Sequence, residues 1–332
     1  MMKIEEILNL KNEMEIEKVL GETQKLKRRF FGKKIYFYVP SFMYYKNSFY
    51  RSSQTSFPTI SITGKNCALK CKHCGGKVLE TMYPATTPES LFKLCKELKD
   101  KKCLGCLISG GCLPDGSVPL EKFVEAIRKV KDKLGLIVHV HTGFINFQTA
   151  KKLKEVGVDA ALIDIIGSNE TIKEIYKLDA TVDSYEKSLK ALHDAGIVTV
   201  PHVIVGLHYG RILGEVNALK MISKYEPSAL VIIAFMPIHG TEMENVKPPK
   251  PLEIAKVLAI ARIMFPKTPL SLGCMRPKGK HRVKTDLLAI KAGVNAIAFP
   301  TEEAVKFAVE HGYDFSFSPL CCSQVYLDSK NL

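Results

Sequence analysis

Residues 58–76 read PTISITGKNCALKCKHCGG, a short β-branched segment that runs directly into a loop rich in cysteine and glycine. Downstream, further short apolar segments alternate with amphipathic helical stretches, which is the pattern of parallel βα units. The helical stretches include Pro88–Leu98, Pro119–Leu134, Asp183–Ala195 and Leu252–Met264. Eight strands are predicted, at Thr59–Thr63, Cys106–Ser109, Ile137–His141, Ala160–Ile165, Val198–Val205, Leu230–Phe235, Pro269–Leu272 and Ala296–Phe299.

Eight such units predict an α/β fold with a single (β/α)8 barrel. A parallel sheet needs a helix across each connection, and closing the sheet removes its edges. A doubly wound open sheet is the alternative fold. We expect residues 1–57 to form an N-terminal helix and cap, residues 58–312 the barrel, and residues 313–332 a cysteine-containing tail that closes the active-site mouth. In such a barrel the chemistry lies at the carboxyl ends of the strands.

Composition narrows the function classes. The N-terminal residues have no continuous apolar segment of a signal peptide, and no stretch has the length of a membrane span, so we expect a cytoplasmic protein without a membrane partner. Ten cysteines then point to thiolates for metal binding or catalysis instead of disulfides. The net charge of +14 comes without a nucleic-acid-binding motif, so we expect an acidic protein partner and no nucleic acid.

Three cysteines follow the first predicted strand with the spacing C-x3-C-x2-C: Cys67, Cys71 and Cys74. Three thiolates in one loop can ligate three irons of a 4Fe-4S cluster and leave the fourth iron open to a small molecule. The alternative is a zinc site, for which three cysteines are one ligand short unless His73 is the fourth. The cluster is the preferred interpretation.

This cysteine motif after the first strand of a βα barrel resembles the radical S-adenosylmethionine (SAM) superfamily. The resemblance implies that the open iron chelates the methionine part of SAM and that the reduced cluster generates a 5'-deoxyadenosyl radical. Cys67, Cys71 and Cys74 would then be the catalytic cluster ligands. His73 stands where the family often has an aromatic residue.

Further cofactor contacts are implied by the same resemblance. Gly110 and Gly111 are similar to the family's glycine pair that meets the methionine amino group, although a tight turn also explains two glycines. Ile204 and Gly206 match the adenine-binding strand, which here lacks the usual leading glycine and trailing glutamate. Asp164, at the end of a predicted strand, would hydrogen-bond the ribose or methionine, or else cap the next loop.

Within the superfamily, segments across most of the barrel resemble biotin synthase and its relatives. They are Pro237–Thr241, Ala261–Met264, Leu270–Gly273 and Ala292–Asn295. The second-cluster ligands of biotin synthase itself are not matched, because His139, His141, Val200 and Pro269 stand at or near those positions. A relative of biotin synthase with another reaction is therefore expected.

The remaining cysteines suggest a second 4Fe-4S cluster. Cys112 and Cys274 each follow a predicted strand, and the tail carries the vicinal pair Cys321 and Cys322. Together these four thiolates would bind the auxiliary cluster. The alternative is that the vicinal pair has no metal-binding role and simply places one side chain inward and one outward. Of the others, Cys95 is assigned to the core. Cys103 and Cys106 stand at the start of the second predicted strand. We interpret them as a packed pair or a surface thiol pair in preference to a metal site.

A second cluster beside a radical source suggests sulfur insertion, and the combination resembles the archaeal two-component lipoyl synthases. The resemblance implies an octanoyl-type chain on an acidic carrier protein as substrate, an electron donor such as a ferredoxin, and a possible partner radical SAM enzyme. The alternatives are a maturase or small-molecule cofactor biosynthesis enzyme, and, in another class, an iron-sulfur scaffold or electron carrier.

Overall fold

The structure, a computed structural model, describes residues 3–329 and contains one parallel sheet. Its 11 strands pair in the order β11-β1-β10-β9-β8-β7-β6-β5-β4-β2-β3. The strands are β1 (Ile35–Tyr38), β2 (Thr59–Ser61), β3 (Tyr83–Pro84), β4 (Gly105–Ser109), β5 (Ile137–His141), β6 (Ala160–Asp164), β7 (Thr199–Val205), β8 (Leu230–Ala234), β9 (Leu270–Leu272), β10 (Ala296–Ala298) and β11 (Phe315–Ser318).

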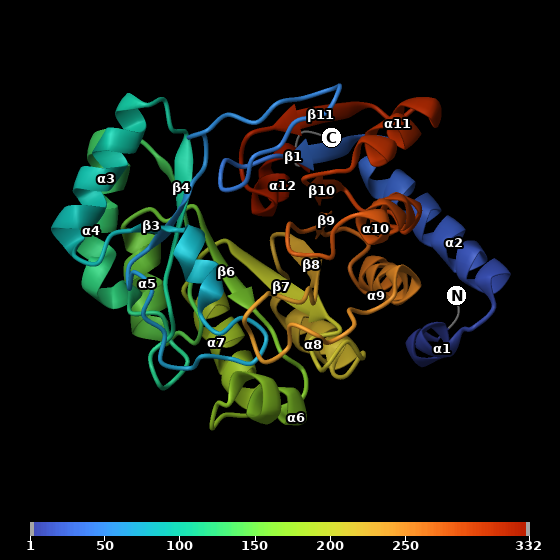
Figure 1. Ribbon diagram of the computed structural model, residues 1–332, viewed down its shortest axis with the longest axis horizontal. Helices are drawn as coiled ribbons and strands as arrows, with labels where there is room; N and C mark the ends of the chain where they lie inside the picture. The colour runs from blue at the N-terminus through green and yellow to red at the C-terminus, as the bar shows by residue number, and fades with distance from the viewer. Residues whose placement is uncertain (1–2, 330–332) are drawn as a thin grey trace.

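Helices cover the outer face of this sheet, which curves into a crescent (Figure 1). The α-helices are α1 (Ile4–Asn9), α2 (Glu13–Phe31), α3 (Pro88–Asp100), α4 (Val124–Lys129), α5 (Phe147–Glu155), α6 (Asn169–Thr171), α7 (Val182–Asp194), α8 (Glu215–Ile222), α9 (Pro251–Met264), α10 (Lys280–Lys291), α11 (Glu302–Glu310) and α12 (Val325–Asp328). Shorter 3-10 and π turns are η1 (Lys77–Thr81), η2 (Leu120–Phe123), η3 (Val130–Leu134), η4 (Ile172–Tyr176), η5 (Ser223–Tyr225) and η6 (Cys322–Gln324).

Local sequence explains where several helices begin. The Thr87 hydroxyl accepts the Ser90 N–H at 3.1 Å, and Pro88 occupies the first turn of α3, where its missing N–H costs nothing. Thr301 caps α11 in the same way. At the N-terminus, α2 packs on α9 and α10, so the predicted N-terminal helix lies against the barrel wall.

All eight predicted strands are present, parallel and in the expected order. The sheet, however, does not close into the expected barrel. Among residues 3–329, β3 and β11 form the two ends of the sheet and do not pair with each other. Three unpredicted strands extend it: β3 adds outside β2, and β1 pairs with both β10 and β11. Residues 39–57, which link β1 to β2, cross the open side (Figure 1). The fold is a parallel partial barrel, and residues 35–38 belong to its sheet and not to a cap.

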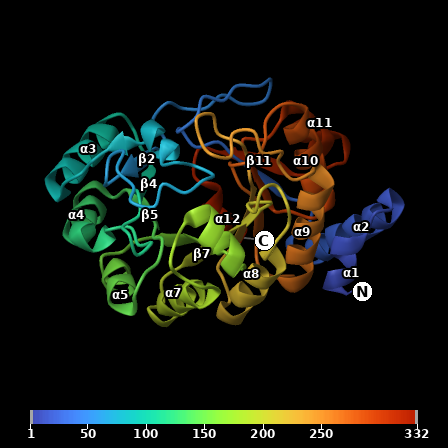
Figure 2. The same cartoon turned by 60° about the horizontal axis from the view of Figure 1, so that its bottom comes forward.

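The sequence led us to expect that the C-terminal tail closes the mouth of the barrel. The tail instead fills the inside of the crescent. Cys322, Val325 and Tyr326 pack in a core with the inward side chains of the strands. The Tyr326 hydroxyl donates to the carbonyl of Asp159, directly before β6, at 3.1 Å. Since that residue lies at the amino end of its strand, the end of the tail lies on the side of the barrel opposite the mouth. Figure 2 shows α12 in the middle of the fold, surrounded by the other helices.

No helix within the described range is both long and apolar enough to span a lipid bilayer.

Candidate active site

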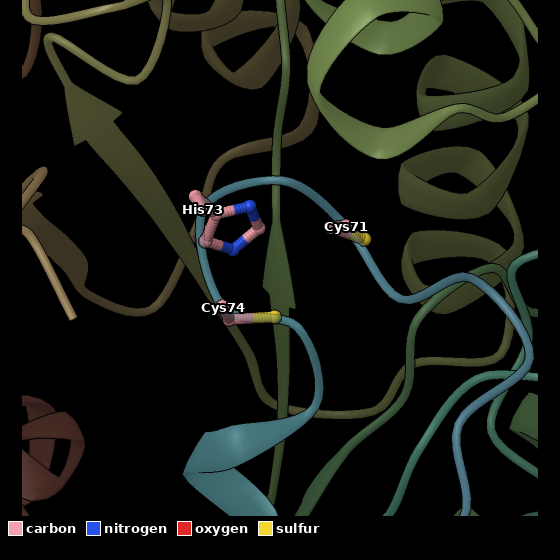
Figure 3. Close-up of side chains that lie close together, drawn as sticks. All are labelled: Cys71, His73 and Cys74. Carbon is pink, nitrogen blue, oxygen red and sulfur yellow. The ribbon is translucent and has the colours of Figure 1, made fainter. Parts of the chain in front are cut away.

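The cysteine loop leaves β2 at the carboxyl edge of the sheet, which we call the mouth. Its bend is held by backbone hydrogen bonds from Cys74 N and Gly75 N to the carbonyl of Cys71, at 3.2 and 2.7 Å. Lys70 and Gly76 take left-handed backbone conformations, with φ of 44° and 79°. The bend therefore turns Cys71 and Cys74 to the same side of the loop (Figure 3).

The thiols of this loop interact with one another. A hydrogen bond with Cys71 lowers the pKa of Cys74 to about 4, and the same contact raises the pKa of Cys71. A hydrogen bond with the Cys112 thiol lowers the pKa of Cys67 to about 5. Since the thiolate is the form that ligates metal, the crowding of these thiols and the lowered pKa values of Cys67 and Cys74 suit a bound cluster.

His73 lies in the same bend, and one of its ring nitrogens is within 4.8 Å of the sulfurs of Cys71 and Cys74. Its Nδ1 is buried and has no hydrogen-bond partner among the described residues, and its ring packs 5.2 Å from that of Tyr176. Cys67 is not part of this three-residue group. Only three of the four ligands required by the zinc alternative therefore lie together: Cys71, His73 and Cys74.

Gly110 and Gly111 directly follow β4, and a packing constraint explains the second glycine. A Cβ on Gly111 would lie 2.0 Å from the carbonyl oxygen of Asn66 and 2.6 Å from the Cβ of Cys67. The Gly111 N–H donates to the Thr63 hydroxyl at 2.7 Å. The pair thus lets the cysteine loop approach the sheet, and its contact with a methionine amino group stays a prediction.

Asp164 ends β6 and points into the barrel beside two histidines. His141 ends β5, His202 lies on β7 opposite Asp164 in the strand register, and His141 Nε2 is 3.5 Å from Asp164 Oδ1. Burial opposes ionisation of Asp164, yet His141 holds the pKa of this carboxyl below its usual range. Asp164 is therefore a carboxylate that can accept hydrogen bonds at the mouth.

Ile204 and Gly206 lie at the carboxyl end of β7, as the adenine prediction requires. Gly206 has φ of 74°, and a Cβ there would lie 2.6 Å from the ring of Pro249. Its N–H donates to Glu215 Oε1 at 2.7 Å. The strand lacks the family's trailing glutamate, but a buried carboxylate from the start of α8 reaches it from the neighbouring element.

Glu215 is a site residue that the sequence analysis missed. The only local signal is the acidic first position of α8 after Gly214, which any helix N-terminus favours. Desolvation by burial raises the pKa of Glu215 to about 7, from an ordinary value of 4.5. The carboxyl is therefore largely protonated in mildly acidic solution.

We expect Glu215→Gln to flatten the pH dependence of stability between pH 5 and 7. The pKa in the folded protein exceeds that of the unfolded chain, so the stabilisation from the protonated form is complete below pH 4.5 and is lost as pH rises to about 7. The loss is on the order of 3 kcal/mol. Thermal unfolding across this range measures it, with Glu97→Gln, at an exposed position of α3, as control. An unchanged pH profile in Glu215→Gln would contradict the assignment.

The four cysteines proposed for a second cluster are divided between two places. Cys274, Cys321 and Cys322 lie together inside the barrel, where Cys321 interacts electrostatically with Cys274 and by hydrogen bond with Cys322. Cys112 sits at the mouth, where a hydrogen bond with the Cys67 thiol raises its pKa. The structure therefore does not bring Cys112 together with the other three, because the cysteine loop folds back over the end of β4.

A short polar network surrounds the tail cysteines. The Ser323 hydroxyl lies 3.0 Å from Cys321 Sγ and 3.0 Å from His139 Nδ1. His139 Nε2 is fully buried and has no partner within residues 3–329. Burial raises the pKa of Cys274 to about 11.

Cys95, Cys103 and Cys106 are all buried in the main core. The core assignment of Cys95 is confirmed. Cys103 donates to the carbonyl of Gly105 at 3.1 Å, and Cys106 packs against Cys95. The preferred interpretation of Cys103 and Cys106 as a packed pair at the start of the second predicted strand is thus supported.

Two known families match this chain. Residues 61–210 match the Radical SAM superfamily, and residues 232–316 match the Biotin and Thiamin Synthesis associated domain. Biotin synthase of Prochlorococcus marinus is 26% identical over 255 residues, which cover 72% of this chain and 73% of that protein. The 3-methylornithine synthase of Methanosarcina acetivorans is 23% identical over 261 residues, covering 79% and 69%.

Solved structures share the fold. A methylornithine synthase superposes with a TM-score of 0.66 at 18% identity, covering 94% of this chain and 93% of that one. A maturase of the [FeFe]-hydrogenase gives a TM-score of 0.68 at 17% identity, covering 97% and 72%. At these identities the likeness concerns the fold alone.

Proposed function

We propose a function for this chain from one premise: it belongs to the radical SAM superfamily and, within it, to the biotin synthase-like subfamily. The observation that carries the proposal is the position of the cysteine loop at the mouth of the partial barrel, where the thiols of Cys71 and Cys74 meet and Cys67 acts electrostatically on Cys71. These three residues would hold a 4Fe-4S cluster. When bound, the cluster and SAM supply a reductive cleavage that yields methionine and a 5'-deoxyadenosyl radical.

The remaining mouth residues would position SAM. Backbone groups of Gly110–Gly111 face the methionine, the Asp164 carboxylate accepts from the ribose hydroxyls, and the backbone near Ile204 and Gly206 meets the adenine. Glu215 acts through Gly206, because its carboxyl oxygen accepts the N–H of that residue. The tail closes the barrel from below, so that a reactive carbon above it is shielded from water.

At a finer level, we propose sulfur insertion of the lipoyl synthase type into an octanoyl chain. The presence of Cys274, Cys321 and Cys322 in one interior region supports it, since small movements could bring these thiols onto iron and sulfide below a substrate carbon. In this reaction the hydrogen atom would pass from the carbon to the 5'-deoxyadenosyl radical, giving 5'-deoxyadenosine. The carbon radical would then bond to one sulfide, which is consumed as a substrate, and one electron would pass to an iron(III) held by these thiols. A saturated carbon offers no acidic proton, which is why a radical is needed.

The partners follow from the same proposal. A net charge of +14 suits an acidic carrier protein that bears the acyl chain, and it equally suits an acidic electron donor such as a ferredoxin. A second radical SAM enzyme would modify the other carbon. One sulfur atom per substrate is then the expected yield of this chain.

Mass spectrometry of an octanoylated or mercapto-octanoylated carrier peptide tests sulfur insertion. With reconstituted enzyme, dithionite and SAM, we expect a gain of one sulfur atom together with 5'-deoxyadenosine. Cys274→Ser should lose the sulfur gain and keep 5'-deoxyadenosine formation, whereas Cys95→Ser, in the core, should keep both. Sulfur insertion is wrong if neither peptide gains sulfur while another compound drives 5'-deoxyadenosine formation that survives Cys274→Ser.

That opposite outcome would support a second candidate, radical chemistry on a small polar substrate in cofactor or ligand biosynthesis. The specific observation in its favour is the polar lining formed by His141, Asp164 and His202, which suits a charged molecule better than an acyl chain. Relatives named 3-methylornithine synthase and [FeFe]-hydrogenase maturase share the fold. A scaffold or electron carrier would need no such group of polar side chains inside the barrel.

A further inference from the structure

Three metal-binding side chains meet inside the barrel and form a group distinct from the one in the cysteine loop. His141, Asp164 and His202 come from the adjacent strands β5, β6 and β7, and their side chains point to the same interior face. One donor atom from each lies within 4.8 Å of the other two. A transition-metal ion forms bonds of roughly 2.0–2.2 Å to such donors, so binding would draw the three atoms closer together.

The hydrogen bonding of His202 prepares it to be a ligand. Its Nδ1 lies 3.1 Å from the carbonyl oxygen of Val200, so Nδ1 carries the proton. The lone pair of Nε2 is then free to face the group. A backbone carbonyl that fixes the tautomer of a histidine in this way is the usual outer partner of a metal-ligating imidazole.

Burial and charge also suit a cation. His202 is 9% exposed, whereas the side chains of His141 and Asp164 are 25% and 30% exposed. A metal ion would therefore have protein ligands on one side and open positions toward the mouth on the other. No lysine or arginine is among the main charged groups that act on the Asp164 carboxylate, which are His141, His202 and His73.

We propose that His141, Asp164 and His202 bind one divalent transition-metal ion, at a site separate from the cluster at Cys67, Cys71 and Cys74. Two imidazoles and one carboxylate form a donor set that suits Fe²⁺, Co²⁺ or Zn²⁺ and leaves coordination positions open. A carboxylate or amine of a substrate could occupy those positions. This inference goes beyond the proposed function and does not depend on SAM cleavage, since its test needs neither SAM nor a cluster.

Cobalt(II) is the probe, because its visible absorption reports its ligands. The parent is the full chain with Cys67, Cys71, Cys74, Cys274, Cys321 and Cys322 replaced by alanine, so that neither the loop thiols nor the interior thiols can compete for the ion. Titration should give one bound Co²⁺ per chain, with ligand-field bands and no sulfur-to-cobalt charge transfer. In this parent, His202→Ala should weaken binding at least about 100-fold, since losing only an outer partner costs 10–100-fold.

Matched variants keep the test decisive. Asp164→Asn preserves the shape of the side chain and should also weaken Co²⁺ binding, while the exposed His193→Ala should not. Melting without metal checks that each variant folds. Cys321 acts electrostatically on both His141 and His202, and its replacement in the parent removes that thiol as a competing ligand. The proposal is overturned by equal Co²⁺ affinity in the triad variants or by no stoichiometric Co²⁺ binding in the parent.

Discussion

Replacing Cys67, Cys71 and Cys74 together by alanine abolishes the reductive cleavage of SAM. Their thiols at the mouth would bind three irons and leave the fourth iron open. No other three cysteines in the sequence share the C-x3-C-x2-C spacing. After anaerobic reconstitution with iron and sulfide, the wild-type chain with dithionite should convert SAM to 5'-deoxyadenosine. The triple variant should fall to the level without enzyme, measured by liquid chromatography.

The control removes the same number of thiols from the core. A variant with Cys95, Cys103 and Cys106 replaced by alanine should keep SAM cleavage, because those residues lie in the main core and not at the mouth. Both variants are checked by melting before activity is measured. Radical SAM function as assigned is refuted if the loop variant still forms 5'-deoxyadenosine.

Replacing Arg276 by methionine destabilises the fold strongly. Arg276 and Asp286 are both fully buried, with Nε and Oδ1 2.8 Å apart. The guanidinium also donates to the carbonyls of Gly273 and Ala298 at 2.6 and 2.8 Å, and thereby joins the ends of β9 and β10. Removing it leaves Asp286 as an unpaired buried carboxylate, which costs about 3–5 kcal/mol. Denaturant unfolding should show a correspondingly lower midpoint.

Two comparisons separate this pair from an ordinary ion pair. The double variant Arg276→Met with Asp286→Leu removes both charges and should recover part of the lost stability. Lys190→Met breaks the exposed pair with Asp194 and should leave the midpoint within error. If Arg276→Met behaved like Lys190→Met, the buried pair would not hold the strand ends together.

The strands that could be predicted are those with enough local signal. Each of the eight predicted strands is a run of β-branched or apolar residues between turn residues, and each is present. β1, with the sequence IYFY, was assigned to a cap because its aromatic residues precede the expected barrel. β3 has only two residues, and β11 reads FSFS. Their pairing depends on partners far away in the sequence, which no local pattern reveals.

The candidate site divides in the same way. Cys67, Cys71 and Cys74 are close in sequence, so their spacing alone identified them. The position of Cys112 beside Cys67 could not be predicted, because the return of the cysteine loop, with Ala68 N donating to the carbonyl of Cys112 at 2.8 Å, is a tertiary contact. Glu215 was missed for the same reason.

The position of β1 between β10 and β11 has a consequence for how the chain folds. The Tyr36 hydroxyl bonds to the carbonyl of Asp328, 292 positions later, and both neighbours of β1 in the sheet belong to the last part of the sequence. The four buried residues of β1 therefore find no ladder partners until the C-terminal strands are available. Such long-range pairing makes folding slow and leaves an apolar strand open to association with other chains in the meantime. Acquisition of the native sheet should accordingly be limited by the docking of its two chain ends, and assistance by a chaperone should act on that step.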